Sequence, residues 1–193
     1  MNSTSSSVEL LLDAGSKREI RVPILTTRLE LRPFADRDTD SIAALLADRE
    51  VTKYIGDVRS REDAATSVKV MREAFLERGW GTLAVTLRGR ANAIGYCGVR
   101  PLAHTAELEI AFALERDCWN LGYATEAAYA SVDAAFSTLG IDSIVATVYP
   151  QNQPSLRVLE KLRMKLDSKV FGHWPMSAAL LFRVHRDAWC KRS

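Results

Sequence analysis

The chain has 193 residues, 47% of them hydrophobic and 26% charged, enough for one substantial core and too few for two complete domains. Its 26 basic and 24 acidic residues give a formal charge of +2 and are spread along the chain, which argues against a nucleic-acid-binding surface. No apolar stretch approaches membrane-spanning length. We therefore expect one globular domain that binds neither nucleic acid nor membrane.

The residues that most often bind metals are scattered. The chain holds three cysteines and three histidines, at Cys97, Cys118, Cys190, His104, His173 and His185. The cysteines lack CxxC spacing and stand apart from the histidines, so we expect reduced thiols, no metal and a cytoplasmic protein.

The first residues carry no recognisable chemistry. We expect a partly mobile leader over 1–23 and a single domain over 24–193. About the first seven residues are serine-rich, and the stretch that follows, 8–24, is expected to form a peripheral hairpin or stay irregular. Leu29 and Leu31 alternate with charged residues, which predicts a half-buried strand that ends at Pro33.

The remaining elements follow in a mixed order. Two helices are expected over 36–51 and 60–79, the second with Ser60 as N-cap and Gly79 as its end. The later elements are strands over 80–87, 93–100 and 106–115, a helix over 123–139, a strand over 143–149, a short helix over 154–163, and apolar segments over 165–171 and 178–185. The closely spaced strands from 80 to 115 predict an antiparallel meander.

The stretch "CWNLGYATEAA", residues 118–128, places Gly122 just before the first turn of the helix over 123–139. Free backbone N–H groups at a helix start bind anions, and a glycine lets a phosphate approach the backbone. Gly122 is equally explained as a simple turn residue, and the spacing matches neither a Walker loop nor a GxGxxG fingerprint.

The strand before this turn, "AELEIAFALE", has two distinct faces. Leu108, Ile110, Phe112 and Leu114 point one way, as core, while two carboxylates and two small residues, Glu107, Glu109, Ala111 and Ala113, point the other. The second face suits a slim ligand beside a carboxylate that transfers a proton, or it is a solvated outer face.

A third segment, "YPQNQPSLRVLEKL", starts the short helix. Asn152 as N-cap and Pro154 in the first turn explain it structurally, with Ser155 as an ordinary first-turn residue.

Together these segments resemble the GNAT N-acetyltransferases, in particular the RimJ/RimL-like branch that acetylates ribosomal proteins. The resemblance covers about residues 24–189 and rests on "LTTRLELRPFADRD", "AIGYCGV", "AELEIAFALERDCWNLGYATEAA", "NQPSLRVLEKL" and "FRVHRDAW". This chain departs from the family at Arg163 and Met164, where a glycine and an aromatic residue are usual, and at Leu121, where a basic or small residue is common.

The resemblance implies an α/β (α+β) fold with a mixed, mostly antiparallel sheet of about seven strands flanked by helices. It implies a V-shaped splay between the fourth and fifth strands, where acetyl-CoA binds. The implied cofactor-binding residues are Phe112, Ala113, Leu114, Asn120, Leu121, Gly122, Tyr123, Ala124, Thr125, Asn152 and Ser155. The pyrophosphate would meet the amides of 120–125, and the pantetheine would follow 112–114.

The implied reaction is direct transfer of the acetyl group to a primary amine, either a protein N-terminus or a small molecule. Glu109 matches the glutamate of the family's strand motif and is the expected base, with Glu107 or a water chain as alternatives; Ser155 is expected to protonate the departing thiolate. The acceptor walls are expected from the first two helices and from the region of His173 and Trp174. A homodimer is compatible with the sequence.

Two other functions stay open at this point. An acyl-CoA-binding or regulatory module would need the phosphate turn and no catalysis. A nucleotide-binding α/β protein is disfavoured, because a meander followed by one crossover is not a doubly wound sheet.

Overall fold

The computed structural model describes residues 18–171 and 178–191. Within them the chain forms one mixed sheet of eight strands in the order β1-β2-β3-β4-β5-β6-β8-β7. The strands are β1 (Ile24–Leu25), β2 (Leu29–Arg32), β3 (Thr82–Leu87), β4 (Ala93–Pro101), β5 (Leu108–Leu114), β6 (Ser143–Val148), β7 (Lys165–Phe171) and β8 (Ala178–His185). The fold class is confirmed, but the expected count of seven strands is wrong, because the two residues of β1 pair with β2 as an added edge strand.

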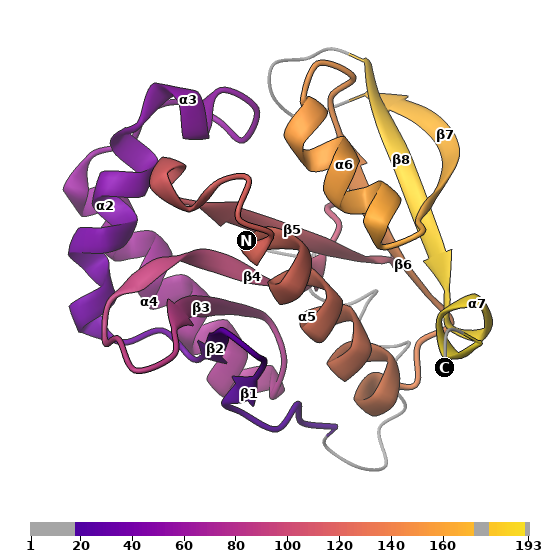
Figure 1. Ribbon diagram of the computed structural model, residues 1–193, viewed down its shortest axis with the longest axis horizontal. Coiled ribbons are helices and arrows are strands. Elements are labelled where there is room, and N and C mark those ends of the chain that lie inside the picture. The colour runs from indigo at the N-terminus through magenta and orange to yellow at the C-terminus, as the bar shows by residue number, and fades with distance from the viewer. Residues whose placement is uncertain (1–17, 172–177, 192–193) are drawn as a thin grey trace.

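Helices cover both faces of this sheet (Figure 1). They are α2 (Thr39–Ala47), α3 (Arg49–Thr52), α4 (Arg61–Arg78), α5 (Tyr123–Leu139), α6 (Gln153–Lys161) and α7 (Arg186–Cys190), with 3₁₀ turns η1 (Asp36–Asp38) and η2 (Arg116–Cys118). In Figure 1, α5 crosses in front of the central strands, and α4 lies behind β3. No helix among the described residues is long and apolar enough to cross a membrane.

The expected helix over 36–51 is interrupted. Asp38 is fully buried, and its carboxylate accepts hydrogen bonds from the Arg32 guanidinium and from the Ala35 N–H, which caps the start of the 3₁₀ turn η1 ahead of α2. Asp48 has an extended backbone and accepts from the Glu50 N–H as the N-cap of α3. The chain therefore leaves the helical conformation at Asp48, whereas Asp38 keeps helical backbone angles, φ −80° and ψ −11°, so η1 runs directly into α2.

The other helix ends follow the sequence. Ser60 and Asp63 form a reciprocal capping box at the start of α4, and Gly79 ends this helix in the left-handed conformation at φ 77°. Gly140 ends α5 in the same way at φ 67°. The predicted caps Ser60 and Gly79 are confirmed, and so is the predicted end of the helix over 123–139.

Two apolar clusters hold the layers together. The larger one joins α5 to one face of the sheet and includes Leu108, Ile110 and Leu114. The smaller one joins α2 and α4 to the opposite face through Ala113 and Ala84. The two predicted faces of β5 are therefore both covered by helices.

The sheet opens between β5 and β6. Their parallel pairing consists of a single aligned pair, Glu109 with Val145. Beyond this pair β5 runs on to Leu114 with no partner on that side among the described strands, while β6 continues in register with β8 to Val148. The predicted splay between the meander and the following strand is confirmed.

Candidate active site

The turn from η2 into α5 presents a row of free backbone donors. Asn120 and Gly122 both adopt positive φ, 59° and 83°, and the first helical bond of α5 runs from the Glu126 N–H to the Gly122 carbonyl. None of the six N–H groups of residues 120–125 donates to a described residue. Such a row at a helix start binds anions, phosphate above all.

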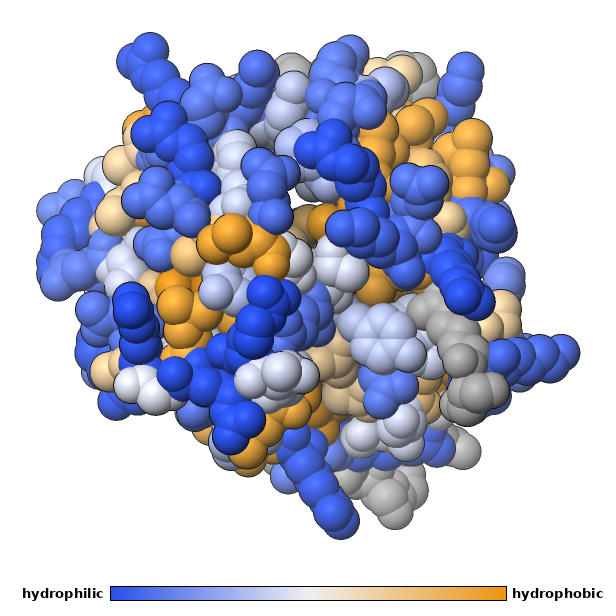
Figure 2. All heavy atoms as spheres, in the orientation of Figure 1, coloured by the Kyte–Doolittle hydropathy of each residue, from blue (hydrophilic) through white to orange (hydrophobic). Residues whose placement is uncertain are grey.

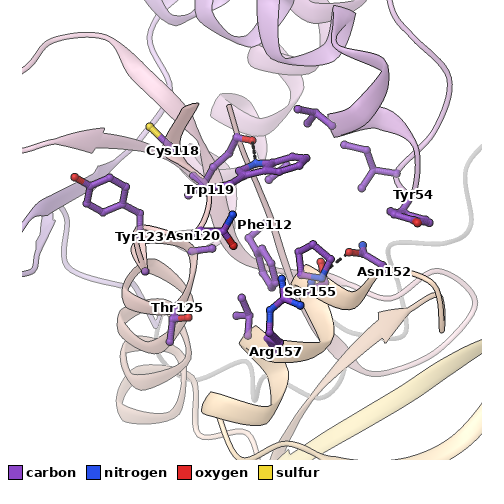
Figure 3. Close-up of a pocket in the computed structure, with 18 of the residues that line it drawn as sticks. Tyr54, Phe112, Cys118, Trp119, Asn120, Tyr123, Thr125, Asn152, Ser155 and Arg157 are labelled. Atoms are coloured by element: carbon purple, nitrogen blue, oxygen red, sulfur yellow. Dashed lines mark hydrogen bonds between the residues drawn. The ribbon is translucent and has the colours of Figure 1, made fainter. Parts of the chain in front are cut away.

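A cavity of about 390 Å³ lies against these amides. It is lined by every predicted cofactor residue except Leu121, namely Phe112, Ala113, Leu114, Asn120, Gly122, Tyr123, Ala124, Thr125, Asn152 and Ser155. Figure 3 shows its walls: Asn120 comes from the turn before α5, Tyr123 and Thr125 come from the first turn of α5, and Ser155 and Arg157 come from α6. We refer to it as the turn cavity.

Three cations border the turn cavity, Lys53, Arg157 and Lys161. None of them forms an ion pair with a residue in the described part of the chain. Figure 2 shows a hollow in the middle of this face with hydrophilic side chains at its edge. Free amides and unpaired cations together fit a ligand that carries several phosphates.

A second cavity of about 550 Å³, the sheet cavity, lies against α2, α4 and β5. It meets the turn cavity at the splay, where Tyr54, Ile55, Phe112, Asn152 and Ser155 line both. These five residues therefore form a wall that the two cavities share. The expected contribution of the first two helices to the acceptor walls is consistent with this lining, whereas His173 and Trp174 lie outside the described residues.

Glu109 lies in the wall of the sheet cavity. It is only 8% exposed, so a solvated outer face is wrong for this residue. Its Oε1 accepts a hydrogen bond at 2.8 Å from Nε of Arg100, directly opposite on β4, while its Oε2 accepts none from a described residue. One carboxylate oxygen is thus held and the other is free to take a proton.

Glu107, the alternative carboxylate, lies elsewhere. It pairs with Arg183 of β8, which also donates to Ser143 Oγ at 3.1 Å. Glu107 is not among the residues that line either cavity. The alternation in the sequence places Glu107 and Glu109 on the same face of the strand. In the structure they pair with different arginines, and only Glu109 lines a cavity.

Asn152 caps α6 as predicted. Its side-chain oxygen accepts a hydrogen bond at 3.2 Å from the Ser155 N–H. This contact holds the first turn of α6 at the place where the two cavities meet, with Ser155 on the wall of both (Figure 3).

The structure adds residues that the sequence analysis missed. Tyr54 donates from its hydroxyl to the Gln151 carbonyl at 3.2 Å and so bridges the α3 side and the α6 side of the cleft. Trp119 donates from its indole N–H to the Leu114 carbonyl at 2.8 Å and fixes the turn to the end of β5. No local sequence pattern indicates that Tyr54 lines the site. The ion pair of Arg100 with Glu109 could have been predicted, because the β4–β5 hairpin register places these opposite charges side by side.

Two of the three cysteines are buried and protonated. Cys97 and Cys118 are buried, as expected for core residues, and Cys190 is exposed. Burial raises the pKa of Cys97 to about 12, and burial together with Glu115 raises that of Cys118 to about 12, so both remain thiols near neutral pH.

Residues 28–165 match the family model described as "Acetyltransferase (GNAT) domain". The chain belongs to the GNAT acetyltransferases. It is 30% identical over 145 residues to an uncharacterized N-acetyltransferase, p20, of Bacillus licheniformis. The aligned region covers 72% of this chain and 80% of that protein.

Solved GNAT structures share the fold. The GNAT-family acetyltransferase from Bacillus anthracis superimposes with a TM-score of 0.75 at 26% identity, covering 85% of this chain and 98% of that one. The RimJ of Mycobacterium smegmatis, solved in complex with CoA-disulfide, gives a TM-score of 0.70 at 20% identity, covering 82% of both chains. The resemblance found from the sequence motifs is thus confirmed at the level of family and fold.

Proposed function

We propose that this GNAT protein transfers the acetyl group of acetyl-CoA to a primary amine, either a protein N-terminal α-amine or a small-molecule amine. The observation that carries the proposal is the meeting of two cavities at the β5–β6 splay. One cavity fits a phosphorylated cosubstrate, and the other holds a buried carboxylate where an acceptor would lie.

The turn cavity is the proposed site of acetyl-CoA. The amides of 120–125 would bind the pyrophosphate, with Lys53, Arg157 and Lys161 neutralising its charge. Pantetheine would lie along the free side of β5 at Phe112 and Ala113. The Leu114 carbonyl already accepts from Trp119, so it is the least available acceptor on this stretch.

Glu109 is the proposed general base. A protonated amine cannot attack a thioester, so Glu109 would take the acceptor proton through its free Oε2, directly or through one water. Arg100 would hold the carboxylate in place through Oε1. The ion pair of Glu107 with Arg183, outside both cavities, supports Glu109 over Glu107.

Ser155 is proposed to protonate the leaving sulfur. As the amide bond forms and the carbon–sulfur bond breaks, the thiolate needs a proton to leave as free CoA. Ser155 lines both cavities at the place where this bond would lie, and Asn152 holds the turn that carries Ser155.

The proposed location is the cytoplasm. The three cysteines are free thiols, which supports a reducing compartment.

The test is a panel of amines and peptides with acetyl-CoA, monitored by release of free thiol. An acceptor that releases thiol and gains an acetyl group by mass spectrometry supports the proposal. Tight CoA binding with no turnover on any acceptor would instead support a binding or regulatory module.

Glu109→Gln sharpens this test on an acceptor found in the panel. Glutamine keeps the shape but removes the base, so we expect CoA affinity to survive and turnover to fall by about 10²- to 10⁴-fold. Glu107→Gln is the matched control, with a mild effect expected. Wild-type turnover by Glu109→Gln at neutral pH would show that this carboxylate is not the base.

A further inference from the structure

Arg28, just before β2, reaches across to the start of α5. Its Nη1 donates to the Leu121 carbonyl at 2.8 Å, and its Nε donates to Glu126 Oε2 at 2.7 Å. The guanidinium also lies over the ring of Tyr123, with its carbon 4.5 Å from the centroid. One side chain thus contacts three residues of the proposed phosphate-binding turn and the first turn of α5.

Glu126 completes the arrangement from the helix side. Its Oε1 accepts from the Thr26 hydroxyl at 2.6 Å and from the Arg28 N–H at 2.8 Å. Burial opposes its ionisation, but these bonds and the one from the Arg28 side chain outweigh it and lower the pKa of Glu126. Glu126 does not line the turn cavity, although Gly122 to Thr125 do.

The bond to Leu121 has a geometric consequence. The Leu121 carbonyl and the Gly122 N–H belong to one planar trans peptide and point in opposite directions. Because Arg28 holds the carbonyl on one side, the Gly122 N–H is turned to the other side, away from the guanidinium.

We propose that Arg28 and Glu126 are positioning residues that hold the Leu121–Gly122 peptide in the orientation that receives the pyrophosphate of CoA. Neither needs to touch the ligand, since both act through the backbone of the turn. This inference rests on the proposed binding of acetyl-CoA at the same turn.

Simple electrostatics makes different predictions. If Arg28 only attracted phosphate, lysine would replace it. If Glu126 only repelled phosphate, its neutral amide would improve binding. Positioning predicts the reverse in both cases, because lysine cannot contact the Leu121 carbonyl and the Glu126 carboxylate at once through a planar fork.

Calorimetric titration with CoA separates these possibilities. Arg28→Lys and Glu126→Gln are each expected to weaken CoA binding by about 10-fold or more, the scale of a lost charge-assisted hydrogen bond. The matched control is Arg88→Gln, because Arg88 also contacts this corner through the Thr26 carbonyl at 3.3 Å but does not reach the turn. The control should bind CoA within about twofold of wild type, as surface changes usually do.

A second measurement reports the peptide itself. The chain has ten glycines, so ¹⁵N-glycine labelling gives a simple amide spectrum in which Gly122 is assigned by its loss in Gly122→Ala. Addition of CoA should shift the Gly122 amide strongly in the wild type and much less in Arg28→Lys. The same spectrum shows whether each variant is folded. If Arg28→Lys does not fold, the CoA affinity of Glu126→Gln tests the positioning role instead.

The outcomes are distinct. Wild-type affinity in Arg28→Lys, or tighter binding in Glu126→Gln, would overturn the positioning role while leaving the proposed function intact. A wild-type protein that does not bind CoA would overturn the proposed function and this inference with it.

Discussion

Gly122→Ala tests the link between backbone conformation and cofactor binding. Gly122 has φ 83° and ψ 0°, a left-handed conformation that costs an L-residue about 1–2 kcal/mol. A Cβ built at Gly122 would also lie 3.3 Å from Nη2 of Arg28, the side chain that holds the turn. We expect alanine to relax the turn out of this conformation. CoA binding must then restore the left-handed turn, and the free energy of binding becomes less favourable by that amount.

The magnitude follows from that strain. Restoring the turn at about 1–2 kcal/mol weakens CoA binding by about 5- to 30-fold. At a CoA concentration of 100 times the wild-type Kd, the stabilisation should fall from about 2.7 kcal/mol to about 1–2 kcal/mol. For a chain of this length, the wild-type shift in Tm is then about 5–10 °C, and that of Gly122→Ala is about one third to two thirds as large.

Gly89→Ala is the matched control. Gly89 has φ 79°, and a Cβ built on it meets nothing within 4 Å. Both variants should lose stability without ligand, but Gly89→Ala should keep the full shift with CoA. The assay is thermal denaturation with and without CoA, followed by titration calorimetry. An undiminished CoA shift in Gly122→Ala would refute the assignment of this turn to the phosphates.

Three further predictions concern stability and reactivity. Arg163, at φ 56°, occupies a left-handed position, so Arg163→Gly should raise Tm by about 1–4 °C in calorimetry, and a lower Tm would contradict the strain. The lowered pKa of Glu126 means that its stabilisation is complete above its ordinary pKa of about 4.3 and is lost as pH falls through the folded value. Urea midpoints of wild type and Glu126→Gln should therefore differ at pH 7, and the difference should shrink as pH falls below about 4.3; a gap that does not shrink on acidification would show that the carboxylate charge is not its source. In thiol titration at pH 8, exposed Cys190 should react at once and buried Cys97 only after unfolding, and a fast phase that survives in Cys190→Ser would show that burial does not protect the others.

The candidate site divides into what local patterns predicted and what they did not. The turn at Gly122, the N-cap at Asn152 and the two faces of β5 were predictable, because each depends on residues a few positions apart. The preference for Glu109 over Glu107 was a resemblance only, since nothing in "AELEIAFALE" separates the two acids. In the structure the two acids have different partners, Arg100 and Arg183, and only Glu109 lines the sheet cavity, which supports the proposal of Glu109 as base.

By itself, the sequence determined most elements and their ends, through period-2 alternation for strands and capping residues for helices, but it missed the edge strand β1 and the breaks within residues 36–51. Motif spacing added the family. Tertiary structure alone decided which distant groups meet, such as Arg28 with Glu126, 98 residues apart, and Tyr54 with the Gln151 carbonyl, 97 residues apart. The physical reason is that caps and turns satisfy backbone groups within one segment, whereas these pairs form only after the sheet has brought separate segments together.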